Sequence, residues 1–336
     1  MANYDGIGIE IIEGGIFKRF QELKPFEGDN YSNKNHSKLL LICESNYFPD
    51  ELESKSVFKD AKKWYLGEDC PLIPEEMKKN VNNDGKIVYL KGLFSTIQKL
   101  LNTDQYNDVA FYNYFLRPAS KKIQNGGKID WGFKKDYTDL DGEVAFVAFC
   151  GVLESLQPDI VIFASTLAWN KMEVFKNKHK KNFDKIVIEK VSHPSSPWWN
   201  KSGGVHGRKK FENLLIDNWV KKNPMNEIVF KKLKTIHSEL RQKFNVEKEQ
   251  ECFSEDGSYL SCLYFKVKDA SFCCETGVKI NDVDFWTCFY KTENSKEIPA
   301  LEGKGYKFAP DLSNDTIVAK IEKQIRQIIE EVSKTS

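Results

Sequence analysis

The stretch GEVAFVAFCGVLESLQPDIVIFA, residues 142–164, decides the fold class of this chain. Its first part, 142–156, has the apolar spacing of an amphipathic helix, and its second part, 159–164, is a short continuous apolar run. Such a run predicts a buried strand. A helix that leads directly into a buried strand is typical of a parallel sheet whose two faces are covered by helices.

The same alternation extends to both sides of this stretch. Further buried strands are predicted at 38–43, 108–113 and 185–191, and further helices at 92–101 and 207–222. We therefore expect an α/β fold, a three-layer α/β/α domain with a four-stranded, mainly parallel sheet. Ligands of such sheets bind beyond the carboxyl ends of the strands, so the segments that follow the strands are the candidate site.

The pattern changes near residues 221–227, and a chain of 336 residues is long enough for two cores. A predicted helix at 228–244 is followed by strand-like segments and by an amphipathic helix at 315–332, for which Asp315 is the expected N-cap. We predict two domains, residues 1–224 and 225–336. The second is expected to be an α+β domain with an antiparallel meander, and it carries no catalytic motif.

Composition limits the possible classes of function. Lys and Arg number 50 against 49 Asp and Glu, so a nucleic-acid partner would have to be bound by local basic patches. No apolar run approaches the roughly 20 residues of a membrane helix, and no secretory leader is apparent, so we expect a cytoplasmic protein without a membrane partner. The eight cysteines form no CxxC pair, and we expect neither a metal site nor a disulfide framework.

Polar motifs follow three of the predicted strands: CESNYF at 43–48, NYFLRP at 113–118, and HPSSPWW at 193–199 with GRKKF at 207–211. In this order they resemble the motifs of the uracil-DNA glycosylase superfamily. That family has a polar turn after its first strand, then an Asn that some branches follow with Arg-Pro, and later His-Pro-Ser before a basic Gly-x-x-x-Phe helix start. The resemblance covers roughly residues 36–222.

The resemblance implies hydrolysis of the N-glycosidic bond of a base that is flipped out of DNA. His193 would donate a hydrogen bond to the base oxygen as negative charge develops there, and Asn113 would read the base edge. Ser45 stands where the uracil-specific branch has its catalytic Asp, whereas Glu44 matches the Glu of a Gly-Glu-Ala-Pro-Gly branch. Any of four residues is a candidate for this role: Glu44, Ser45, Asp50 and Glu51.

The same resemblance assigns further residues to the base and to DNA. Those expected around the base are Asn46, Tyr47 and Phe48, with Trp64 as another stacking candidate. Those expected on DNA are Ser195, Trp198 and Trp199 as a wedge or stacking platform, and Arg208, Lys209, Lys210 and Arg117 as phosphate contacts. Structural roles are the alternatives: Glu44 and Arg117 could form a salt bridge, and at least one tryptophan could pack on the second domain.

Because Ser45 replaces the usual Asp, we expect a modified or damaged base as the substrate rather than ordinary uracil. Phage-defence glycosylases of this superfamily suggest a hypermodified phage base. The enzyme is expected to be monofunctional and to need no cofactor or metal, since the cysteines do not match the iron–sulfur branches. Its partner would be DNA, as a duplex with an extruded base or as a single strand. The second domain would widen the DNA footprint, read a bulky base modification, or bind a protein partner. Two alternatives are a DNA-binding module with a decayed active site and a hydrolase of free nucleosides or nucleotides.

Overall fold

The chain divides into two compact units, Met1–Ser95 with Asp104–Trp219, and Thr96–Thr103 with Val220–Ser336. The boundary between the two units thus falls after Trp219, a few residues before the predicted boundary at position 224. The structure is a computed structural model that describes residues 16–17, 21–32, 36–45, 60–66, 91–101, 107–118, 122–123, 129–130, 137–201, 207–220, 224–253, 258–267, 270–279, 285–292, 305–309 and 312–334.

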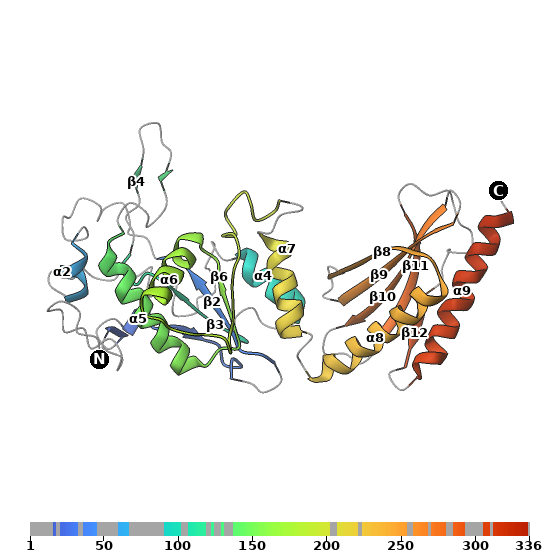
Figure 1. The fold of residues 1–336 in the computed structure, drawn as a ribbon, viewed down its shortest axis with the longest axis horizontal. Helices are drawn as coiled ribbons and strands as arrows, with labels where there is room; N and C mark the ends of the chain where they lie inside the picture. The colour runs from blue at the N-terminus through green and yellow to red at the C-terminus, as the bar shows by residue number, and fades with distance from the viewer. Residues whose placement is uncertain are drawn as a thin grey trace. The chain divides into compact units, whose positions relative to one another are not determined.

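The first unit is built on a five-stranded sheet with the order β1-β3-β2-β6-β7 (Figure 1). Its strands are β1 (Phe26–Glu27), β2 (Leu39–Cys43), β3 (Val109–Asn113), β6 (Ile160–Phe163) and β7 (Val187–Lys190). The four predicted strands are parallel to one another, as expected. The fifth strand, β1, is an antiparallel edge strand of two residues that the sequence did not predict.

Helices cover both sides of this sheet, which confirms the predicted α/β class. Figure 1 shows α5 (Asp139–Leu156) and α6 (Thr166–Lys178) on one side, with α4 (Lys91–Leu101) and α7 (Arg208–Leu215) on the other. The remaining described elements are short: η1 (Gln21–Leu23), α2 (Ala61–Leu66), β4 (Lys122–Ile123), β5 (Ile129–Asp130) and the π-helix η6 (Ile216–Val220). In the described parts of the chain, no helix is both long enough and apolar enough to cross a membrane.

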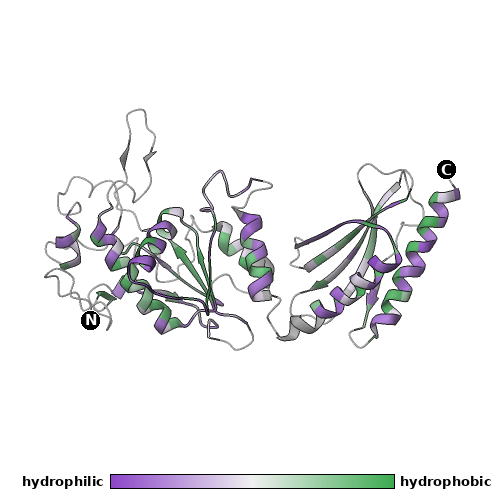
Figure 2. Ribbon diagram, in the orientation of Figure 1, coloured by the Kyte–Doolittle hydropathy of each residue, from purple (hydrophilic) through white to green (hydrophobic). Residues whose placement is uncertain are grey.

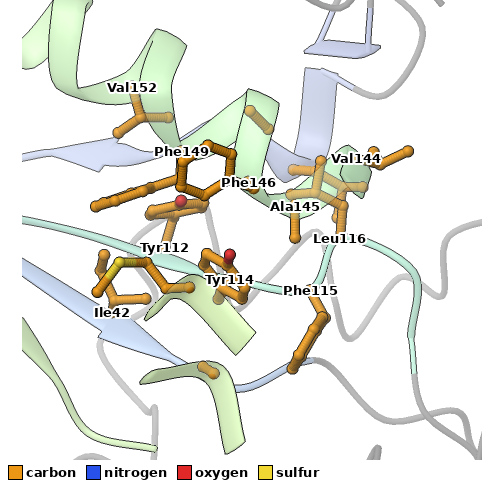
Figure 3. Packing of buried hydrophobic residues seen from close by; sticks show 14 of the residues in the cluster. Ile42, Tyr112, Tyr114, Phe115, Leu116, Val144, Ala145, Phe146, Phe149 and Val152 are labelled. Carbon is orange, nitrogen blue, oxygen red and sulfur yellow. The ribbon is translucent and has the colours of Figure 1, made fainter. Parts of the chain in front are cut away.

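Burial explains why the central strands are continuous apolar runs. Every residue of β2 and β6 is buried, whereas β7 is half-buried along its length, and Figure 2 shows the central strands as hydrophobic. Phe146 and Phe149 of α5 pack over Tyr112, Tyr114 and neighbouring strand residues (Figure 3). This core fixes the sheet, and with it the positions of the strand ends.

A buried ion pair links the segment after β3 to the start of α5. Arg117 Nε and Nη2 donate to Asp141 Oδ1 and Oδ2 at 2.8 and 2.7 Å. Asp141 Oδ1 also accepts the Tyr65 hydroxyl at 2.9 Å, and Oδ2 accepts the backbone N–H and the hydroxyl of Thr138, both at 2.8 Å. Asp141 N–H donates in turn to the Thr138 hydroxyl, which completes a capping box at the start of α5.

The prediction that Arg117 contacts DNA is wrong. Its side chain is only 1% exposed, and its guanidinium is held bidentately by a carboxylate that is fully buried. A phosphate could reach this group only if the core around the start of α5 opened. Arg117 therefore has a structural role, although its partner is Asp141 rather than the Glu44 that the sequence suggested as the alternative.

We predict that breaking this pair destabilises the first unit strongly. Arg117→Met and Asp141→Leu should each lower the free energy of unfolding by about 3–5 kcal/mol, because each leaves a buried charge without its partner. The double variant should cost less than the sum of the two. Urea unfolding followed by tryptophan fluorescence measures this unit well, since six of the seven tryptophans precede residue 220. Arg208→Met, which removes an exposed pair with Glu212, is the control and should cost less than about 1 kcal/mol.

The second unit is an antiparallel sheet with two helices, which confirms the predicted meander. The strand order is β12-β11-β10-β9-β8. Its elements are α8 (Pro224–Lys243), β8 (Val246–Phe253), β9 (Ser258–Val267), β10 (Ala270–Lys279), β11 (Phe285–Lys291), β12 (Gly305–Phe308) and α9 (Asn314–Lys334). The Ser313 hydroxyl accepts the backbone N–H of Thr316 at 3.3 Å, so Ser313 caps α9 in place of the predicted Asp315.

His237 of α8 is the centre of a buried polar cluster between helix and sheet. Its Nδ1 lies 3.1 Å from Ser261 Oγ and 3.3 Å from Glu249 Oε1, and its Nε2 lies 3.3 Å from Thr276 Oγ1. Burial, with a smaller effect of Arg241, lowers the pKa of His237 to about 4. The imidazole is therefore neutral at pH 7 in the folded protein.

This low pKa predicts that the second unit loses stability as the pH falls. Between pH 6.5, near the pKa of an unfolded His, and about 4, the unfolded chain binds more protons than the folded chain. The free energy of unfolding should therefore drop by up to about 3 kcal/mol across this window. Hydrogen–deuterium exchange of the β9 and β10 amides measures it. His237→Gln should remove this part of the pH dependence, and an unchanged dependence would contradict the assignment.

Candidate active site

The carboxyl ends of four parallel strands meet at one edge of the first sheet. Asn113 ends β3, and Glu44, Ser165 and His193 follow β2, β6 and β7. Within the sheet, β3 lies next to β2 on one side and β6 lies next to β2 on the other. The direction of the strand order therefore reverses at β2, which makes this edge a topological switch point. Three strand spacings, or roughly 14 Å, separate β3 from β7. The edge is therefore wide enough for a nucleotide-sized ligand.

Glu44 is held in place by the first residue after β6. Its Oε2 accepts a hydrogen bond from the Ser165 hydroxyl at 2.7 Å. The same hydroxyl oxygen accepts the backbone N–H of Ala168 at 3.2 Å, so Ser165 is also the N-cap of α6. Because the cap fixes the Ser165 rotamer, the Glu44 carboxylate is oriented by a rigid helix start.

His193 lies in a tight turn that fixes the tautomer of its ring. The Ser195 backbone N–H donates to His193 Nδ1 at 3.2 Å, and Ser195 Oγ lies 2.6 Å from the same nitrogen. A backbone N–H can only donate, so Nδ1 must be the acceptor. In a neutral imidazole the proton is then on Nε2.

The electrostatic surroundings keep His193 neutral at pH 7. Burial lowers the pKa of His193 below its usual value, while the Glu44 carboxylate acts in the opposite direction. The two side chains thus influence each other electrostatically across the ends of β2 and β7. The edge of the sheet thus combines a carboxylate with a neutral imidazole that donates through Nε2.

The other predicted pocket residues have different outcomes. Asn113 is half-buried at the end of β3. Ser45 is 7% exposed, and within the described ranges its hydroxyl has no hydrogen-bond partner. Trp64, a stacking candidate, is corrected to a core residue because it is 1% exposed and meets Tyr65 edge-to-face. The remaining candidates lie outside the described residues: Asn46, Tyr47, Phe48, Asp50 and Glu51.

The two adjacent tryptophans separate into a buried residue and an exposed one. The Trp199 indole is 4% exposed and packs between Gly92 of α4, which leaves room for Nε1, and Phe211 of α7, at a ring distance of 5.9 Å. The prediction that Trp199 contacts DNA is therefore wrong. Trp198 is 57% exposed, and Lys201 Nζ lies 4.0 Å from the centre of its ring. A wedge role remains open to Trp198 alone.

The start of α7 contacts the backbone of the two tryptophans. Arg208 N–H donates to the Trp199 carbonyl at 2.8 Å. Gly207 has a φ of +103°, and a Cβ there would lie 2.4 Å from the Trp198 carbonyl oxygen. A glycine is therefore required at this position, which gives the Gly of the GRKKF motif a backbone role.

The basic residues at the start of α7 are partly paired in this structure. Arg208 Nε donates to Glu212 at 2.8 Å, and Lys210 Nζ to Glu189 at 2.7 Å. Such partly exposed pairs contribute little to stability, so both groups can turn to a phosphate at small cost. Lys209 and Ser195 are exposed.

Sequence reasoning missed Ser165, although the signal was present. A Ser between a buried strand and a helix is an N-cap, and its place at the end of a parallel strand puts it in the site. In the described ranges, no group of three or more His, Cys, Asp or Glu side chains is placed so that it could hold a metal ion. The Cys43 thiol is buried, which raises its pKa to about 12 and makes it a poor nucleophile.

Comparison with known proteins adds no relative. No family model, no curated protein and no solved structure matches the chain.

The proximity of Glu44 and His193 gives a testable pKa effect. Glu44→Gln removes the negative charge that favours the imidazolium, so the pKa of His193 should fall further. Nitrogen–proton correlation spectra recorded against pH measure this, with the His193 signal assigned from its loss in His193→Gln. The same spectra in the native protein should show the proton on Nε2. Glu154→Gln, an exposed change near the end of α5, is the control and should leave the titration unchanged.

Proposed function

We propose that this chain is a monofunctional DNA glycosylase that hydrolyses the N-glycosidic bond of a flipped-out modified or damaged base and leaves an abasic site. The observation that carries this proposal is the combination of a neutral, Nε2-protonated His193 after β7 with a carboxylate, Glu44, after β2, two strands away along one sheet edge. The order of the motifs along the chain supports it independently.

The chemistry of the bond explains why this pair is suitable. When the bond between C1′ and the base nitrogen breaks, its electron pair moves to the base, and negative charge develops on a base oxygen. A donor that is already oriented toward that oxygen stabilises the transition state more than the ground state. His193 Nε2–H is such a donor, and its neutral form donates without giving up a proton at pH 7.

The sugar left behind has positive charge at C1′, which a carboxylate stabilises. Glu44 would supply this charge and orient the water that attacks C1′. The water oxygen forms the new bond to C1′, one water proton is taken up by the carboxylate and passes to the leaving base, and the hydroxyl stays on the abasic sugar. The Ser165 hydroxyl would hold Glu44 in this orientation throughout.

The exposed Trp198 supports the DNA part of the proposal. Flipping a base costs a few kcal/mol of stacking and pairing energy, which an inserted side chain can offset. Trp198 is a large exposed aromatic shortly after the His193 turn, Lys201 lies over its ring, and Arg208, Lys209 and Lys210 follow at the start of α7. We expect these residues to contact the DNA backbone in the cytoplasm, on a duplex or on a single strand.

The choice of a modified base rests on Ser45. A buried hydroxyl in place of the carboxylate of the uracil-specific branch changes the polar groups offered to the base and to the water. Since the carboxylate is then Glu44, on the neighbouring residue, the reacting atoms must lie differently from those of a uracil enzyme. A larger or differently substituted base would fit this change, and a hypermodified phage base belongs to that class.

Base release measured by mass spectrometry tests the proposal. The DNA panel contains uracil, hypoxanthine, hydroxymethyluracil and genomic DNA from phages with glucosylated cytosine. We expect a free base and an equal number of abasic sites from at least one DNA. Removing a single positioned donor to a developing oxyanion costs about 100- to 1000-fold in rate, so His193→Ala should lose at least that much, and Glu44→Gln should lose activity as well.

The controls separate chemistry from folding and binding. Glu154→Gln changes a carboxylate away from the site and should keep full activity. Trp198→Ala should weaken DNA binding while the pKa of His193 stays the same. If no DNA releases a base although the protein binds DNA through Trp198, the chain is a binding module, and the glycosylase proposal is overturned.

A further inference from the structure

The second unit has a sheet face that the first unit's proposed chemistry does not use. Along β9, alternate residues face α8: Phe230 of the helix meets Tyr259 with ring centres 4.6 Å apart, and Phe244 meets Phe265 at 6.1 Å. The residues between them face the opposite side. We call this opposite side the open face, and its described residues on the three central strands are Leu260, Cys262, Tyr264, Lys266, Ser271, Cys273, Glu275, Gly277, Trp286, Cys288 and Tyr290.

The open face has an apolar floor of its own, separate from the core under the helices. Leu260, Cys262 and Cys273 form a buried cluster, and the described side chains that pack against it, Tyr264 and Trp286, also come from the sheet. No described helix residue belongs to this cluster. In Figure 1, α8 and α9 lie side by side, in agreement with their packing against each other.

Aromatic rings lie across this floor. A Cβ on Gly277 would be 2.3 Å from Trp286 Cζ2, so the indole rests directly against the backbone of the central strand. Glycine weakens the interior of a strand, and its presence there often marks a close approach of another group. Tyr264 and Trp286 are partly exposed, and Tyr290 is 49% exposed. The face therefore offers ring surfaces to the solvent on both strands that flank β10, namely β9 and β11.

Lysines border these rings, while Glu249 and Glu251 of the edge strand β8 are on the other side of the sheet. Lys248 is paired across from Tyr264, with Nζ 5.5 Å from the ring centre, and Lys307 is paired across from Trp286. Glu249 of β8 faces the helix side, where it contacts His237. Among the described residues that the strand register assigns to the open face, Glu275 is the acidic one, against three exposed lysines: Lys248, Lys266 and Lys307.

We propose that the open face binds single-stranded DNA, with bases stacked on Tyr264, Trp286 and Tyr290 and with phosphates near the three lysines. Aromatic platforms and cationic borders together are the chemistry of single-strand binding, because every base has a π-face and every linkage a negative charge. A second copy of this chain is disfavoured as the occupant, since it would bring the same lysines against each other. The choice of DNA over RNA rests on the proposed function of the first unit.

Binding is measured on the full chain by fluorescence anisotropy of a labelled oligomer of about twelve thymidines, which spans a typical single-strand site. Trp286→Leu should weaken binding about tenfold, the usual effect of losing one stacked base. Lys248→Gln and Lys266→Gln should each weaken binding and lower the salt slope of log K by about 0.7. The matched controls are Lys231→Gln and Lys234→Gln, exposed lysines of α8 on the helix side, which should leave both quantities unchanged.

Three outcomes would overturn this proposal. If the open-face lysine variants bind and respond to salt like the native chain, the lysines do not contact DNA, whatever happens to the packing in Trp286→Leu. If the lysine or tryptophan variants change the association state instead, as measured by sedimentation, the face is an interface between copies. If a uridine oligomer binds more tightly than the thymidine oligomer, the assignment to DNA fails.

The same experiment separates this proposal from the glycosylase proposal. Thymidine oligomers need no base release, so His193→Ala should bind them like the native chain even if it has lost all activity. If binding depends on Trp198 and is unaffected by all open-face variants, the DNA site lies in the first unit, and the inference about the open face is wrong while the proposed function stands.

Discussion

The candidate site depends on a buried charge that has no part in its chemistry. Arg117 leaves the end of β3 and enters the core, where Asp141 holds it with two hydrogen bonds and is itself held by Tyr65 and Thr138. Because a buried ion without its partner costs several kcal/mol, the chain after β3 has one low-energy path, toward the start of α5. This path fixes where β3 ends, and Asn113 is placed at the sheet edge as a result.

The other site residues are positioned in a similar way, by the hydrogen bonds that helix starts and turns require. The Ser165 hydroxyl oxygen accepts a backbone N–H at the start of α6, and the hydroxyl proton is donated to Glu44. The backbone of the His193 turn donates to Nδ1 and so leaves the proton on Nε2. Orientation at the site is thus a by-product of saturating backbone donors, which is why few additional residues are needed to organise it.

Much of the first unit could be predicted because a strand that is buried on both faces has a continuous apolar sequence, as β2 and β6 do. The two-residue edge strand β1 has no such pattern, and its pairing with β3 exists only in three dimensions. The role of Arg117 was predicted wrongly because the local sequence around a basic residue does not reveal its partner. A phosphate and a buried carboxylate 24 positions away are equally consistent with that sequence. Trp198 and Trp199 have the same local sequence context, and only the packing of Gly92 and Phe211 against one of them distinguishes their roles.

The two units place opposite demands on the same kinds of side chain. At the sheet edge of the first unit, the proposed reaction calls for a few fixed polar groups in a half-buried position, and burial keeps His193 neutral there against the opposite effect of Glu44. On the open face of the second unit, the lysines are exposed and the rings are partly or largely exposed, which suits the proposed weak contacts to many bases. A weak site that is tethered to a selective one raises the effective concentration of substrate without new selectivity. The two proposals therefore agree on one substrate: the exposed face would hold a DNA strand with little regard to sequence, and the half-buried edge would select one rare base in it.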